Sequence, residues 1–131
     1  LARFYGPKRE KFLGALKSMM EAGVVCSLHS DAPSGPVGFE MIDGAVNRYD
    51  LRQGYQCDMS QAVTVLQAIR CCTYNAAYQS YEEKIKGSIE VGKLADLIIC
   101  DRDILAMDTH ELHNVKVDLT MIDGKVEYQR V

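Results

Sequence analysis

Apolar residues in the first part of the chain recur at spacings of three and four, the period of an amphipathic helix. The clearest case runs from about residue 8 to 22, with Pro7 at its first turn and Gly23 beyond its end. Ser60 and Thr73 are of residue types that cap helix N-termini. The pattern therefore predicts helices over residues 8–22, 39–48, 60–70 and 73–78, with a surface loop over 49–58.

The pattern changes at Gly87, after which turn residues and apolar β-branched runs alternate. Asp123-Gly124 between two such runs is a strong signal for a two-residue hairpin turn. Residues 109–112 have the pattern of a single helical turn. Strands are predicted over residues 95–101, 115–122 and 125–131, so a helix-rich part and a strand-rich part are expected to meet near residue 84.

One short apolar run within the helical part, Val24 to Leu28, reads as a buried strand. His29-Ser30-Asp31 follows at its carboxyl end, the edge where parallel α/β folds place their chemistry. Because side chains alternate along a strand, Ser27, His29 and Asp31 would line one wall. Asp31 is thus the first functional candidate, and the alternative is that it only caps a turn.

Composition narrows the class of protein. The chain has 131 residues, the size of one domain, and its net charge of -3 gives no basic patch for nucleic acid. No apolar run approaches the roughly 20 residues of a membrane span, and no signal-peptide pattern begins the chain, so a cytoplasmic protein is expected. The chain starts at Leu1 within patterned sequence, which suggests a fragment.

Cysteine and histidine spacing gives no metal motif. The cysteines are odd in number and lack Cys-x-x-Cys spacing, which favours free thiols in a reducing compartment, including the adjacent Cys71 and Cys72. His110 and His113 could share a helical face, but the turn is short and has no third ligand nearby. A metal site there is the less favoured interpretation.

Several motifs spread over nearly the whole chain resemble the amidohydrolase superfamily of metal-dependent hydrolases, and within it amidohydrolase family 3. The most specific is the run from Lys86 to Ile99 containing Gly-Lys-Leu-Ala-Asp, continued by Thr120 to Val126. The others are Arg3 with Tyr5-Gly6-Pro7, Ala22-Gly23-Val24 leading to Ser30-Asp31-Ala32-Pro33, Ala45-Val46-Asn47-Arg48, and Thr73-Tyr74-Asn75-Ala76-Ala77.

This resemblance implies an α/β fold, the C-terminal fragment of a (β/α)8 TIM-like barrel followed by strands of a small β-sandwich. Residues 1–84 would be the end of the barrel, with 24–28 as its eighth strand, and residues 85–131 the sandwich portion with its hairpin. The resemblance also implies that Asp31 is a metal ligand that takes a proton from the metal-activated water and passes it to the leaving group. A divalent metal, zinc before others, would support hydrolysis of C–N bonds in a small-molecule substrate.

The remaining ligands of the family would lie upstream of Leu1, and a barrel needs about 250 residues, so the isolated chain is expected to be inactive and metal-free. His29 stands where the family has glycine, and both substrate contact and a packed, hydrogen-bonded histidine remain open. The Gly-Lys-Leu-Ala-Asp run is interpreted as structural, with Asp96 accepting hydrogen bonds from backbone amides of its turn. The alternative from another class is a non-catalytic α+β association or binding module. The bare edges of an isolated eighth strand would make it self-associate as a homo-oligomer or repack its helices.

Overall fold

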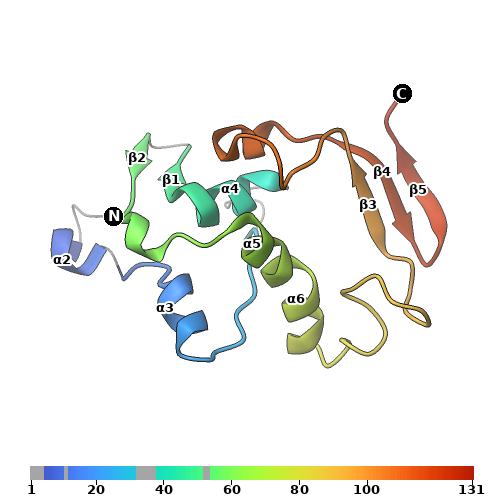
Figure 1. The fold of residues 1–131 in the computed structure, drawn as a ribbon, viewed down its shortest axis with the longest axis horizontal. Helices are drawn as coiled ribbons and strands as arrows, with labels where there is room; N and C mark the ends of the chain where they lie inside the picture. The colour runs from blue at the N-terminus through green and yellow to red at the C-terminus, as the bar shows by residue number, and fades with distance from the viewer. Residues whose placement is uncertain (1–4, 11, 32–37, 52–53) are drawn as a thin grey trace.

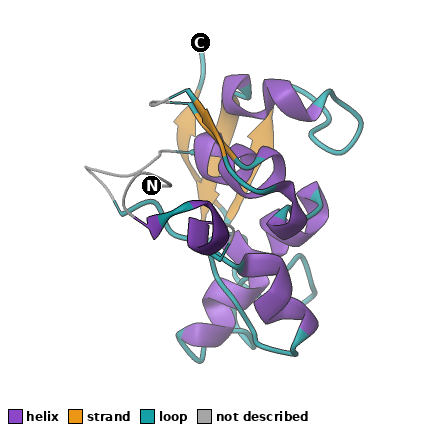
Figure 2. Cartoon of the chain, turned by 90° about the vertical axis from the view of Figure 1, so that its left-hand side faces the viewer, coloured by secondary structure: helices purple, strands orange, loops and turns teal. Residues whose placement is uncertain are grey.

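The computed structural model describes residues 5–10, 12–31, 38–51 and 54–131, and it has an α/β architecture (Figure 1). Helices gather in the upstream part, and a three-stranded sheet lies at the other end of the molecule. Figure 2 shows the same mixture of helices and strands from the side. The elements are α2 (Pro7–Glu10), α3 (Leu16–Glu21), α4 (Phe39–Asn47), β1 (Tyr49–Asp50), β2 (Tyr55–Gln56), η1 (Met59–Gln61), α5 (Val65–Cys72), α6 (Tyr74–Gln79), β3 (Leu97–Cys100), η2 (Thr109–Asn114), β4 (Val117–Ile122) and β5 (Lys125–Gln129).

The single helix predicted over residues 8–22 is wrong, because the structure divides it into α2 and α3. Gly14, between them, has a φ of 58°, in the left-handed region that ends a right-handed helix. The guanidinium of Arg48 donates hydrogen bonds to the carbonyls of Leu13 (2.8 Å) and Gly14 (3.2 Å). A side chain more than thirty residues away thus binds the carbonyls that a continuous helix would have used.

The helix predicted over residues 60–70 begins later than its pattern suggested. Asp58, rather than Ser60, caps the short 3-10 helix η1 by accepting the backbone N–H of Ser60 at 2.7 Å. Helix α5 starts after Thr64, whose hydroxyl accepts the N–H of Gln67 while the Gln67 side chain accepts the N–H of Thr64. This capping box satisfies two amide groups that the helix itself cannot bond.

The other predicted helices are confirmed with small shifts. Helix α4 ends at Asn47, and α6 follows Thr73, although the Thr73 hydroxyl donates to the Ile69 carbonyl (2.9 Å) and makes no cap. The surface loop expected over residues 49–58 contains a small antiparallel pair, with Tyr49 opposite Gln56. The N–H of Gly54 closes that pair by donating to the Asp50 carbonyl at 2.8 Å.

The strand predicted over residues 24–28 is absent, since residues 24–31 carry no regular secondary structure. A strand needs a neighbour with which its backbone can pair, and none of the described strands lies beside this segment. Helices α5 and α6 bind the backbone of this segment instead. The backbone N–H of Leu28 donates to the Cys71 carbonyl of α5 (3.4 Å), and the side-chain amide of Asn75 in α6 donates to the Cys26 carbonyl (2.8 Å).

The three C-terminal strands form an antiparallel sheet in the order β3-β4-β5, as their patterns predicted. Asp123 and Gly124 connect β4 to β5 with φ values of 48° and 78°, which confirms the predicted hairpin turn. Asp96, just before β3, accepts the backbone N–H of Asp123 at 2.8 Å. The Asp96 carboxylate therefore binds the hairpin turn, not the turn in which it lies.

A common core joins the two parts of the chain. Leu112, in η2 between β3 and β4, is 0% exposed and lies in the cluster built mainly by the upstream helices. The other buried members of this cluster are Leu16, Cys26, Ile42, Ala45, Val46, Val63, Ala68 and Cys71. No helix among the described residues is long and apolar enough to span a membrane.

Gly87 offers a test of how closely the loop after α6 approaches that helix. A Cβ at Gly87 would lie 2.7 Å from the Cβ of Ala77 and 3.1 Å from the backbone of Thr73 and Tyr74. We expect Gly87→Ala to lower the free energy of unfolding by about 1–2 kcal/mol for its φ of 93° and by about 1–3 kcal/mol more for the collision. Urea titration would measure the change.

Gly92→Ala is the matched control, because Gly92 has the same φ of 93° and nothing within 4 Å of its added Cβ. The Gly92→Ala variant should lose only the part of the unfolding free energy that comes from placing alanine at a φ of 93°, about 1–2 kcal/mol. Equal losses in the two variants would show that Gly87 does not contact α6 as described.

Candidate active site

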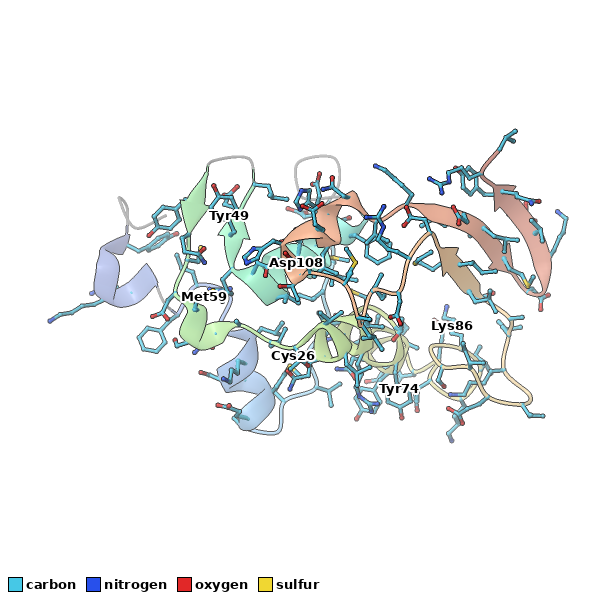
Figure 3. The ribbon with its side chains drawn as sticks, turned by 45° about the horizontal axis from the view of Figure 1, so that its top comes forward. Cys26, Tyr49, Met59, Tyr74, Lys86 and Asp108 are labelled. Carbon is cyan, nitrogen blue, oxygen red and sulfur yellow. The ribbon has the colours of Figure 1, made fainter. Side chains whose placement is uncertain are left out.

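The predicted site follows the extended segment that crosses helices α5 and α6. Cys26 is buried in the helical core, and Figure 3 labels it. The Ser27 hydroxyl donates to Oε1 of Gln79 in α6 at 2.6 Å. Since residues 24–31 form no strand, the expected alternation of Ser27, His29 and Asp31 along one wall does not apply. Ser27 instead helps to anchor the segment to α6.

Asp31 and His29 both have exposed side chains at the end of this anchored segment. Asp31 has a φ of 50°, a conformation that aspartate and asparagine adopt more readily than most residues. Both were chosen as candidates because polar residues follow the apolar run Val24 to Leu28. The roles assigned to them remain predictions.

The described residues do not complete a metal site around Asp31. No group of three or more His, Cys, Asp or Glu side chains within the described part of the chain could hold a metal ion. A catalytic zinc needs about three protein ligands, so Asp31 would be one member of a larger set.

His113 belongs to a buried polar network that sequence patterns did not reveal. Its Nδ1 lies 2.6 Å from Oδ2 of Asp43, and its backbone N–H donates to the same oxygen at 3.2 Å. The side-chain amide of Asn47 donates to the other Asp43 oxygen (2.8 Å) and to the Thr109 carbonyl (2.7 Å). These contacts join α4 to η2, and Asp43 is the partner of both the His113 ring and its backbone N–H.

Removing a side chain of this network should lower the free energy of unfolding, because Asp43 and Asn47 are buried. We expect Asp43→Ala to lower the free energy of unfolding by about 1–3 kcal/mol, since it leaves buried groups without partners. A double-mutant cycle with His113→Ala should give a coupling energy of about 0.5–3 kcal/mol. The exposed Glu111–Asn114 hydrogen bond (2.7 Å) in η2 provides the control cycle, for which little coupling is expected. Equal coupling in the two cycles would contradict a buried network.

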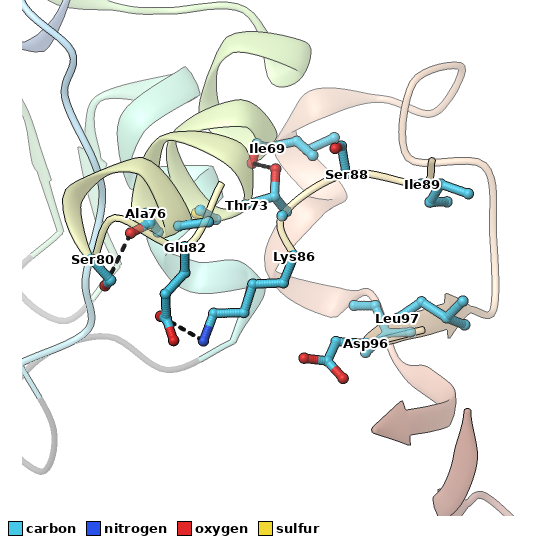
Figure 4. Close-up of a pocket in the computed structure, with 14 residues that line it drawn as sticks. Ile69, Thr73, Ala76, Ser80, Glu82, Lys86, Ser88, Ile89, Asp96 and Leu97 are labelled. Atoms are coloured by element: carbon cyan, nitrogen blue, oxygen red, sulfur yellow. Dashed lines mark hydrogen bonds and ion pairs between the residues drawn. The ribbon is translucent and has the colours of Figure 1, made fainter. Parts of the chain in front are cut away.

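An apolar groove separates helices α5 and α6 from strand β3 (Figure 4). It comprises two cavities of about 610 and 570 Å³ that share Ile69, Cys72, Thr73, Asp96, Leu97 and Ile98. The ion pair between Lys86 and Glu82 (2.7 Å) lies at one side of the larger cavity. The lining is dominated by aliphatic side chains, and no sequence motif pointed to this groove.

The groove contains the thiols of Cys72 and Cys100, and burial raises the pKa of both. Burial, with a smaller contribution from the nearby Cys71, raises the pKa of the Cys72 thiol to about 11. Cys72 therefore stays protonated near neutral pH, whereas a reactive cysteine needs its thiolate. All five cysteines are free, which confirms the prediction of unpaired thiols at Cys71 and Cys72.

The Gly-Lys-Leu-Ala-Asp run forms a compact, charged turn. The Lys93 ammonium donates to the Ser88 hydroxyl at 2.6 Å and pairs with the Glu90 carboxylate at 3.2 Å. The Ser88 hydroxyl and Lys93 hold the pKa of Glu90 below its usual value. Lys93 and Arg70 also lie over the Tyr74 ring, 5.6 and 4.6 Å from its centroid. These contacts fit the structural interpretation of the run.

A comparison with protein-family models matches the Amidohydrolase family over residues 1–128. The chain belongs to the amidohydrolase family. The match includes Asp31, the polar turn at Lys93 and the C-terminal hairpin.

Two curated relatives and one solved structure extend this result. The chain is 39% identical over 116 residues to an N-substituted formamide deformylase of Arthrobacter pascens, covering 88% of this chain and 21% of that protein. It is 32% identical over 128 residues to the Bacillus subtilis (strain 168) protein YtcJ, which carries the name amidohydrolase, covering 95% and 24%. The crystal structure of an amidohydrolase from Thermotoga maritima MSB8 matches with a TM-score of 0.64 at 20% identity, over 96% of this chain and 36% of the other.

The chain thus spans about a fifth to a quarter of the length of these amidohydrolase relatives. The structural match shows the fold, and its partial coverage of the other chain fits a fragment of a larger architecture.

Proposed function

We propose that this chain is the C-terminal part of a metal-dependent amidohydrolase that hydrolyses C–N bonds of amides in small molecules. The observation that carries the proposal is the family match across residues 1–128, which includes Asp31. In this proposal residues 1–84 end a (β/α)8 barrel and residues 85–131 belong to an accompanying β-sandwich. The extended segment 24–31 would then find its neighbouring strands in the rest of the protein.

Asp31 is the residue to which we assign the central role. Its carboxylate would accept a proton from the attacking water and deliver it to the leaving nitrogen, and it would also be one ligand of a divalent ion, zinc in the first instance. When bound, such an ion lowers the pKa of water and polarises a carbonyl group. Since no group of three or more potential ligand side chains occurs among the described residues, the other ligands would come from outside this chain.

His29 and the substrate class complete the proposal. The His29 side chain is exposed two residues before Asp31, which favours substrate contact over a packed histidine. The relative with 39% identity is named for deformylation of N-substituted formamides, so small N-substituted formamides are the first substrates to test.

Metal analysis tests the proposal directly. After dialysis, the purified 131-residue chain should contain no stoichiometric divalent metal, whereas the complete protein should retain about one equivalent or more. Elemental analysis of both proteins, prepared in parallel, gives the comparison. Stoichiometric metal in the short chain would show that His29, Asp31 and neighbouring residues form a site of their own. Its absence from both would count against metal-dependent chemistry.

A second candidate is a non-catalytic module that keeps the amidohydrolase C-terminus for association or binding. The apolar groove and the half-exposed Ile98 and Ile99 of β3 favour this alternative. Light scattering on the chain would distinguish the two, since an association module should form a defined homo-oligomer. A stable monomer would contradict the module.

A further inference from the structure

We draw no further inference here: the strongest candidate, the apolar groove between helices α5 and α6 and strand β3, carries nothing because no observation in the structure shows what covers it.

Discussion

Replacing Asp31 by asparagine in the complete enzyme is expected to lower kcat by about 10²–10⁴-fold, the usual contribution of a positioned acid–base group. Asparagine is nearly the same size, and it tolerates the φ of 50° found at this position. The substitution therefore removes the charge of the carboxylate while leaving the backbone in place. Turnover of an N-substituted formamide and metal content should be measured on the same preparation.

Asp103→Asn is the matched control for this experiment. The Asp103 side chain is also exposed, and it accepts the backbone N–H of Leu105 at 2.9 Å, which an asparagine oxygen can do equally well. We expect kcat to be unchanged in this variant. If Asp31→Asn retained full turnover and metal, the role proposed for Asp31 would be wrong even though the family assignment would stand.

Leu112→Ala is expected to lower the free energy of unfolding by about 2–5 kcal/mol. The Leu112 side chain is fully buried, so its loss leaves a cavity in the core that η2 shares with the upstream helices. Because a domain is stable by only about 5–15 kcal/mol, the loss is a large part of the total. Chemical denaturation followed by circular dichroism would measure it in this chain.

Leu105→Ala makes the same chemical change at a side chain that is 62% exposed. We expect a change within about 0.5 kcal/mol, as for most surface substitutions. Leu112→Val, which removes less volume, should fall between the two and keeps the comparison possible if the alanine variant does not fold. Equal stability of the Leu112→Ala and Leu105→Ala variants would contradict a shared core.

Elements specified by local signals were predicted from the sequence. The hairpin follows from Asp123-Gly124, whose positive φ values suit a two-residue turn, and α4 follows from its own apolar spacing. The break at Gly14 could not be predicted, because it depends on the reach of Arg48 across the fold. The strand expected over residues 24–28 failed for a related reason, since a strand is defined by neighbours and this segment packs on helices.

In the candidate site, too, local sequence patterns indicate some features, whereas others depend on contacts between distant residues. The choice of Asp31 and His29 as candidates came from a local pattern, polar residues after an apolar run, and both side chains are exposed. The Asp43–His113 contact joins residues 70 positions apart, so no local spacing could reveal it. The groove likewise exists only once β3 has been placed opposite α5 and α6.

The place of Leu112 also determines how this polypeptide can be divided. The sequence changes character near residue 84, yet a chain cut there would separate Leu112 from the hydrophobic cluster that also contains Ala68 and Cys71, all 0% exposed. Each piece would expose to water an apolar surface that is covered in the intact chain. We therefore expect each piece alone to be less stable than the intact chain.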